Sequence, residues 1–186
     1  MSHTPTPSQT VGPFFSIGLS ALCREDIQSP AEIGDRVRIR GRVLDGDGQP
    51  VPDALLEIWH AGLAEPLTQA TAAQQGHFPA GFGRIATNER GEFQFTTRKP
   101  TLRRDPDGTE HAPHLVVVLL MRGLLRHLMT RIYFADEAAN ANDPVLNIIP
   151  VGRRETLLAK QSSSGENDFL WNVHLQGESE TAFFDV

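Results

Sequence analysis

Two closely spaced histidines precede the longest apolar run of the chain, and their residue type first suggests chemistry. The run ends at Met121, and His111 and His114 stand at its entrance. Imidazole is a common ligand of transition metals. In an extended chain, however, side chains three positions apart point to opposite faces, and the residue two positions after His114 is Val116. The spacing alone therefore favours a structural pair, with His114 bonded to backbone at the strand entrance, over half of a metal site.

Motifs of the common hydrolases and nucleotide-binding proteins are absent. The chain contains no Gly-x-Ser-x-Gly, no Walker-type loop and no Rossmann glycine fingerprint. The lone Cys23 has no neighbouring histidine and cannot form an internal disulfide. A net charge of -6 argues against a nucleic-acid partner. With no signal-peptide pattern and no apolar run of membrane-spanning length, we expect a cytoplasmic protein.

Short alternating segments dominate the chain and predict strands. In Arg36–Leu44, apolar and glycine positions alternate with four arginines, which is typical of a half-buried strand whose charged face is solvated or paired with acids. We expect Ala54–Trp59 to return beside it as a hairpin, and Gly83–Thr87 and Phe93–Thr97 to form a second hairpin. Further expected elements are strands at Glu110–Met121, His127–Phe134 and Phe169–Leu175, an edge or docking strand at 177–184, a helix at Arg154–Lys160, a helical turn or loop at 136–142, and a surface loop at Leu63–Ala80.

This pattern predicts an all-β fold, an antiparallel β-sandwich with long loops, a short helix and an extended N-terminal arm. The length of 186 residues suits one domain. We assign residues 1–35 to the arm and linker and residues 36–186 to the sandwich. The arm carries Phe14 and Phe15, which need an apolar environment. It is either a strap on its own domain or a segment that docks on a partner subunit.

Phrases along nearly the whole chain resemble the intradiol ring-cleaving dioxygenases, and more closely the α chains of their protocatechuate-cleaving members. Because these phrases occur in the family's order, the resemblance is more specific than any single motif. They are Thr6–Phe14, Gly41–Val51, Leu56–Trp59, Ala112–Leu115, Thr130–Phe134, Arg153–Leu157 and Gln176–Thr181.

The resemblance implies an Fe(III) cofactor that this chain does not bind. Catalytic chains of the family hold the ion with two tyrosinates and a His-x-His pair. Here His114 takes the first histidine place and Val116 the second. The tyrosines would fall near Leu67 and Arg103, whereas Tyr133 is the single tyrosine of the chain. The resemblance therefore implies no metal ligand in this chain, with the iron bound by a partner β chain.

The same resemblance implies that this chain completes the substrate pocket of the β chain within a larger hetero-oligomer of αβ units. Thr10, Gly12, Pro13 and Phe14 would line the pocket, although many α chains have Tyr in place of Phe14. Arg131 would bind substrate and take part in catalysis, because a guanidinium suits an acidic ligand. The implied reaction cleaves protocatechuate with O2, between its two hydroxylated carbons, to 3-carboxy-cis,cis-muconate.

Two other hypotheses stay open at this point. A free-standing intradiol dioxygenase would need the ligands that the sequence lacks. A non-catalytic binding module of the transthyretin-like kind remains, because hairpins such as the one expected at Gly41–Trp59 also occur there. Without the resemblance, Arg131 is best interpreted as a solvated strand residue. The arm phrase Pro7–Phe14 and Arg131 distinguish the enzyme subunit from the binding module.

Overall fold

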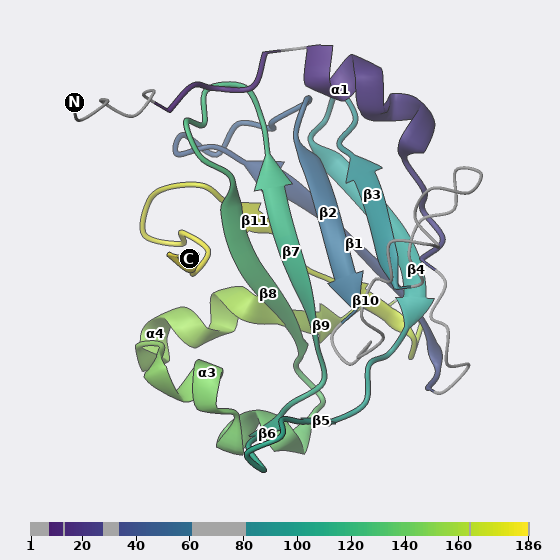
Figure 1. Cartoon of the computed structure of the whole chain (residues 1–186), viewed down its shortest axis with the longest axis vertical. Helices are drawn as coiled ribbons and strands as arrows, with labels where there is room; N and C mark the ends of the chain where they lie inside the picture. The colour runs from purple at the N-terminus through teal and green to yellow at the C-terminus, as the bar shows by residue number, and fades with distance from the viewer. Residues whose placement is uncertain (1–7, 13, 28–33, 61–80, 164, 186) are drawn as a thin grey trace, which may run out of the picture.

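The structure is a computed structural model that describes residues 8–12, 14–27, 34–60, 81–163 and 165–185 (Figure 1). The loop expected at Leu63–Ala80, and with it Leu67, lies outside these residues. The helical segments are α1 (Phe14–Leu19), η1 (Ser20–Leu22), η2 (Ala138–Asn142), α3 (Pro144–Ile148), α4 (Val151–Arg154) and η3 (Glu155–Leu157). The strands are β1 (Arg36–Leu44), β2 (Leu55–His60), β3 (Phe82–Ala86), β4 (Glu92–Arg98), β5 (Arg103–Arg104), β6 (Glu110–His111), β7 (His114–Leu120), β8 (Leu128–Phe134), β9 (Leu158–Gln161), β10 (Asp168–Leu170) and β11 (Val173–His174).

Nine strands of the described chain form one curled sheet. Its order is β11-β1-β10-β9-β8-β7-β2-β3, and β4 pairs with the other side of β1. The pairs β1–β10, β1–β11 and β8–β9 are parallel and the remaining pairs antiparallel, with β5 and β6 forming a separate ribbon. The all-β prediction is confirmed. The sheet is mixed and continuous, however, where we expected an antiparallel sandwich.

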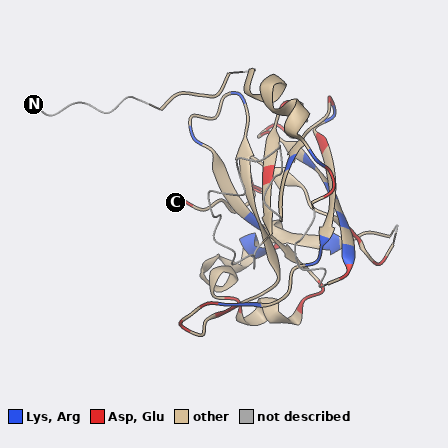
Figure 2. Cartoon of the chain, turned by 45° about the vertical axis from the view of Figure 1, so that its right-hand side comes forward, with Lys and Arg blue, Asp and Glu red and all other residues tan. Residues whose placement is uncertain are grey.

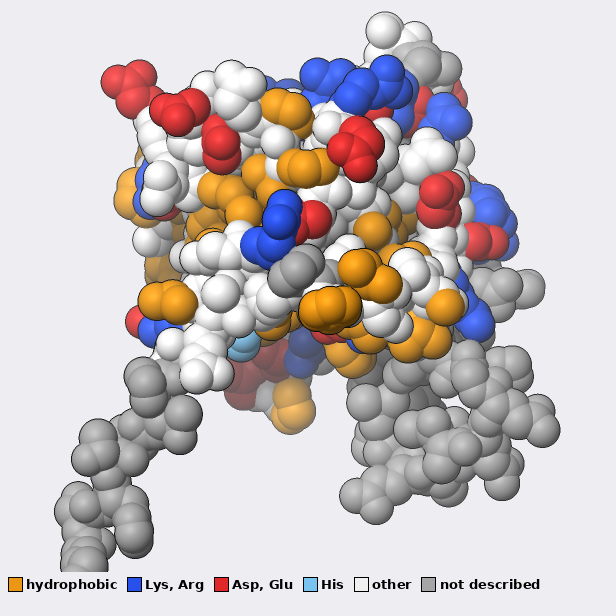
Figure 3. Space-filling view, turned by 90° about the horizontal axis from the view of Figure 1, so that it is seen from above, with side chains coloured by type: hydrophobic (Ala, Val, Ile, Leu, Met, Phe, Trp, Pro, Cys, Tyr) orange, Lys and Arg blue, Asp and Glu red, His pale blue; other side chains and the backbone are white. Residues whose placement is uncertain are grey.

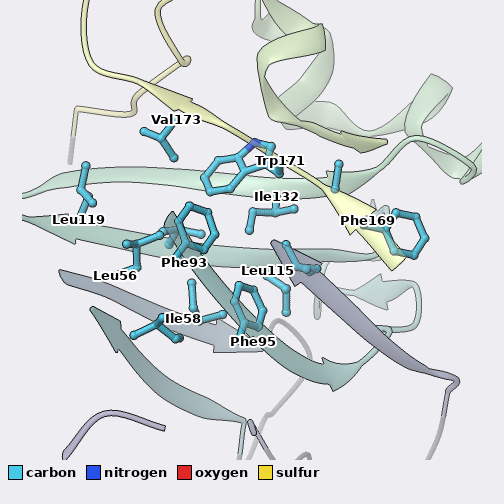
Figure 4. Packing of buried hydrophobic residues seen from close by; sticks show 14 of the residues in the cluster. Leu56, Ile58, Phe93, Phe95, Leu115, Leu119, Ile132, Phe169, Trp171 and Val173 are labelled. Carbon is cyan, nitrogen blue, oxygen red and sulfur yellow. The ribbon is translucent and has the colours of Figure 1, made fainter. Parts of the chain in front are cut away.

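The core lies between the two halves of the curled sheet, as Figure 4 shows. On one side, the alternation of β1 turns Ile39 inward, and Phe95 of β4 lies beside it. On the other side, β2, β7 and β8 contribute Leu56, Leu115 and Ile132, all of which are fully buried. The apolar run of the sequence forms a strand, as predicted, and this strand, β7, lies between β2 and β8 in the sheet.

Both predicted hairpins are wrong, because each turn connects the two halves of the sheet instead of two paired strands. After the turn at Asp45–Gln49, one bridge joins Leu44 to Pro50, and the chain then crosses to β2, which pairs with β3 and β7. Pro50 and Pro52 lack the N–H groups that a ladder beside β1 would require. In the same way β3 pairs with β2, whereas β4 pairs with β1.

The helical predictions were partly wrong. The helix expected at Arg154–Lys160 begins earlier, in α4, and Leu158 already starts β9. Pairing of β9 with β8 and β10 overrides the local helix propensity there. The N-terminal arm is helical in α1 and η1 instead of extended. No helix among the described residues is long and apolar enough to cross a membrane.

The arginine row of β1 is paired with acids on the outer face, as the sequence indicated. Arg38 and Arg40 both contact Asp168, whose side chain is only 5% exposed, at N–O distances of 2.9 and 3.1 Å. Arg36 and Arg42 pair with acids from other segments at 3.0 and 2.8 Å. Figure 2 shows basic and acidic positions interspersed along the ribbon of the chain. The row is therefore a charge-compensated surface and not a basic patch.

Candidate functional site

His114 begins β7, and its contacts define the tautomer and the protonation state of its ring. Its Nδ1 lies 2.7 Å from the carbonyl oxygen of Ala112, which can only accept a hydrogen bond. Nδ1 therefore carries the proton, and Nε2 is a bare acceptor that is buried without a hydrogen-bond partner among the described residues. Burial lowers the pKa of His114 to about 4, so the ring is neutral at neutral pH. The expected backbone bond at the strand entrance is confirmed.

His111 belongs to the short strand β6 and has a different partner. Its Nε2 lies 3.0 Å from Oδ2 of Asp105, and its ring centroid lies 6.1 Å from that of His114. Its Nδ1 lies 3.8 Å from Oδ2 of Asp143. Among the residues described here, no group of three or more His, Cys, Asp or Glu side chains is placed to hold a metal ion. The two histidines are therefore neighbours with separate roles.

Three polar side chains form a line beside His114. Arg131 of β8 donates from Nη1 to the Tyr133 hydroxyl at 3.1 Å, and that hydroxyl donates to Oδ1 of Asp143 at 3.0 Å. Burial raises the pKa of Tyr133, which keeps its hydroxyl protonated. The Arg131 guanidinium also lies 6.0 Å from the centroid of the Phe184 ring, within cation–π range.

Asp143 is the buried end of this line. Its carboxylate accepts hydrogen bonds from the backbone N–H groups of Ala112, Val145 and Leu146 at 2.8 to 2.9 Å. Two of these donors belong to the first turn of α3, for which Asp143 is the N-cap. The carboxylate therefore joins the start of α3 to the connection between β6 and β7. Our sequence interpretation missed this residue, although Asp143-Pro144 before an apolar run is a recognisable helix-start signal.

These residues do not fit the ferric ion that the family resemblance implies. Tyr133 is the single tyrosine of the chain, and its hydroxyl is already engaged by a cation and a carboxylate. The strand register sets Arg131 beside Val116, where the family's second histidine would stand. A guanidinium at that place would repel a trivalent cation. The donor set of two tyrosinates and two histidines cannot be assembled here.

The arm residues lie at another place on the molecule. The hydroxyl of Thr10 accepts a hydrogen bond of 2.9 Å from the N–H of Gly123, in the turn between β7 and β8. The carbonyl of Gly12 accepts one of 3.1 Å from the N–H of Phe15. Phe14 begins α1 and is 79% exposed. Figure 1 shows α1 at the top of the molecule, and Figure 3, which views this end, shows hydrophobic side chains gathered there. Pro13 lies outside the described residues.

In the part of the chain that the structure describes, the arm and Arg131 lie apart. Arg131 pairs with Val116, four residues before Leu120 at the end of β7. At about 3.3 Å per residue, this sets it about 13 Å from the end of β7, and the turn that Thr10 contacts lies beyond that end. A hollow of about 680 Å³ on the described surface lies over β1 and β4, and none of the predicted site residues line it. A shared pocket would need surfaces from another chain.

Comparison with known proteins identifies the family. Residues 12–177 match the family model described as "Dioxygenase". The chain is 40% identical to the protocatechuate 3,4-dioxygenase α chain of Burkholderia cepacia, over 97% of each chain. It is 29% identical to the β chain of the same enzyme in that organism, over 76% of this chain and 62% of the relative.

The fold agrees with these sequence relatives. The structure of 3-chlorocatechol 1,2-dioxygenase from Rhodococcus opacus 1CP superposes with a TM-score of 0.62 at 20% identity, covering 92% of this chain and 67% of that one. The family model covers the central strand, Arg131 and Asp143, and the α-chain relative extends over almost the full length. The chain belongs to the intradiol ring-cleaving dioxygenase family, where its similarity is to the protocatechuate 3,4-dioxygenase α chains.

Proposed function

We propose that this chain is the α subunit of a protocatechuate 3,4-dioxygenase and that it acts without binding iron itself. Its partner is the β chain, which supplies the ferric ion. The complex cleaves protocatechuate with O2, between the two hydroxylated carbons, to 3-carboxy-cis,cis-muconate. The similarity to α and β chains of such an enzyme supports an αβ complex. The dioxygenase relatives favour this role over the transthyretin-like binding module.

The observation that carries the proposal is the chemistry at the start of β7. His114 is neutral and bonded to backbone, Val116 follows it on the outer face, and Arg131 stands beside Val116. A metal-binding chain would present ligands there, whereas this chain presents a cation. A fixed positive charge suits the carboxylate of an aromatic acid. The contribution of this chain is therefore to position an anionic substrate or to balance its charge.

The arm is proposed to complete the pocket from the partner-facing side. In an αβ complex, residues 1–35 dock on the β chain and bring Thr10, Gly12, Pro13 and Phe14 to the substrate. The high exposure of Phe14 supports this role, because a large apolar side chain in water is stabilised by an apolar partner. The separation of the arm from Arg131 within one chain is compatible with two different contacts to the β chain.

The first experiment compares the purified chain with its complex with the β chain. We expect no stoichiometric iron, no ferric colour and no O2 uptake from the chain alone, and all three from the complex. Turnover of protocatechuate by the isolated chain would contradict the proposal. Iron content is measured by metal analysis, so that a folded but inactive complex is distinguished from one without metal.

The second experiment replaces Arg131 by Ala in the complex. Loss of a hydrogen bond to a charged group costs about 1.5 to 3 kcal/mol, so we expect kcat/KM to fall by about ten- to a hundredfold while the iron content stays unchanged. Arg126→Ala is the matched control. Arg126 is an exposed residue near the β7–β8 turn, and its ion-pair partner Asp185 is 93% exposed. Equal kinetics for the Arg131 variant and the wild type would return Arg131 to the surface-residue interpretation.

A further inference from the structure

We infer that Tyr133 and Asp143 are positioning residues for Arg131. They hold its guanidinium in one orientation before the substrate arrives. This inference rests on the proposed function of Arg131 and adds two residues that act through it. The observation behind it is the continuous line from Arg131 Nη1 to the Tyr133 hydroxyl at 3.1 Å, and from that hydroxyl to Asp143 Oδ1 at 3.0 Å.

The direction of the hydrogen bonds makes the line a support for a cation. A carboxylate oxygen can only accept, so the Tyr133 proton points to Asp143 and a lone pair of the hydroxyl is left for the Arg131 N–H. Arg131 is bound through Nη1 on one side, with the Phe184 ring near its carbon. No acceptor among the described residues is recorded for its Nε and Nη2 groups. These groups are the ones that would meet an anionic ligand.

The base of the line is rigid. The Asp143 side chain is fully buried and accepts from three backbone N–H groups besides Tyr133. These donors come from α3 and from the connection before β7, so the carboxylate cannot shift without disturbing two elements. Tyr133 is fully buried and packs at 5.3 Å from the His114 ring. A fixed hydroxyl therefore defines where the Arg131 head can lie.

Preorganisation has a measurable consequence for binding. Ordering an arginine side chain and orienting its guanidinium toward a carboxylate both cost conformational entropy. When one guanidinium nitrogen is already hydrogen-bonded in the free protein, part of this entropy is lost during folding and not during binding. Removing the Tyr133 hydroxyl should therefore weaken substrate binding through Arg131. The reaction of bound substrate depends on the iron of the partner chain and should stay largely unchanged.

The test is a double-mutant cycle in the αβ complex with Tyr133→Phe and Arg131→Ala. Phe keeps the ring in the core and removes only the hydroxyl, and Asp143 retains its three backbone donors. A lost hydrogen bond of about 1 kcal/mol corresponds to about a fivefold effect, so we expect Tyr133→Phe to raise the KM for protocatechuate by about fivefold, with kcat and iron content retained. In the Arg131→Ala background, the same substitution should change KM by less than about twofold.

The cycle separates the alternatives. If Tyr133→Phe raised KM equally with and without Arg131, the tyrosine would have a structural role only and the inference would be wrong. An unchanged KM for Tyr133→Phe beside an impaired Arg131→Ala would also overturn it, while leaving the proposed function intact. Unchanged kinetics for Arg131→Ala itself would refute both. Anaerobic titration of each complex with protocatechuate gives the Kd directly and keeps the test decisive where turnover is too slow to measure.

Discussion

At the scale of single residues, the start of β7 shows that a histidine, a common metal ligand, can have a purely structural role. His114 donates a hydrogen bond to the carbonyl of Ala112, and burial keeps its ring neutral. Arg131, beside Val116, adds a positive charge that further disfavours protonation of the ring. The start of β7 therefore presents a fixed positive charge, that of Arg131, beside a neutral histidine.

The depressed pKa of His114 predicts a specific loss of stability in acid. In the native chain the ring titrates near pH 4, whereas in the unfolded chain it titrates near 6.5. As the pH falls from the unfolded pKa to the native pKa, the unfolded chain binds a proton at this ring and the native chain does not. The free energy of unfolding therefore decreases, by about 3 kcal/mol over the full range. Below about pH 4 both states are protonated and this contribution stays constant.

Urea unfolding at about pH 7 and pH 5 measures this effect. Most of the decrease should disappear in His114→Gln, because the titrating ring is gone. His127→Gln is the control, since it replaces an exposed histidine and leaves His114 in place. An identical pH dependence in the wild type and in His114→Gln would refute the assignment.

At the scale of elements, the parallel contact of β1 with the β10–β11 segment depends on close backbone approach. Gly41 of β1 faces the chain where β10 has ended and β11 has not yet begun. A Cβ at Gly41 would lie 1.7 Å from the carbonyl oxygen of Trp171, a backbone atom that cannot move aside. The Trp171 N–H in turn donates to the carbonyl of Arg40 at 2.9 Å. The glycine is therefore required by packing between two main chains.

We therefore expect Gly41→Ala to destabilise the fold severely. Overpacking against fixed atoms costs about 3 kcal/mol or more, so the variant should lose stability by at least that amount in urea unfolding, or fail to accumulate as folded protein. Gly152→Ala in α4 is the matched control, because a Cβ there meets nothing within 4 Å. The control should keep or slightly raise the unfolding free energy. A Gly41→Ala protein as stable as the control would show that β1 and the β10–β11 segment are not in close contact.

The elements also show what the sequence could and could not predict. Local patterns located β1, β7 and β8, because alternation and unbroken apolar runs report burial directly. They could not tell whether a turn folds a strand back beside its neighbour or carries it across the core, since both need the same turn residues. The turns after Leu44 and Ala86 both carry the chain across the core. The bonds of Asp143 to the start of α3 are local, but its links to the N–H of Ala112 and to the Tyr133 hydroxyl join positions far apart in the sequence and could not be predicted.

At the scale of the whole molecule, the chain has apolar surface that its own fold does not cover. Phe14 and Ile17 of α1 are 79% and 67% exposed, whereas the hydrophobic residues of the core cluster are buried. The candidate site shows the same incompleteness, because Arg131 and the arm lie apart within one chain. Both observations agree with a subunit whose function depends on a second chain, as the similarity to an α chain indicates.

The exposed face of α1 leads to a prediction about assembly. Burying a large apolar side chain contributes about 1.5 to 3 kcal/mol, so Phe14→Ser combined with Ile17→Ser should weaken association with the β chain by about a hundredfold or more. Light scattering after size-exclusion chromatography measures the complex, and titration of one chain with the other gives the Kd. Ile148→Ser is the matched control, because Ile148 of α3 is equally exposed at 79% but lies at the opposite end of the molecule from α1 (Figure 1). If α1 docks on the β chain, the control complex keeps its wild-type affinity, because the α1 contact is untouched. An unchanged Kd for the double variant, or an equal loss in the control, would exclude α1 as the docking surface and assign the arm to its own domain.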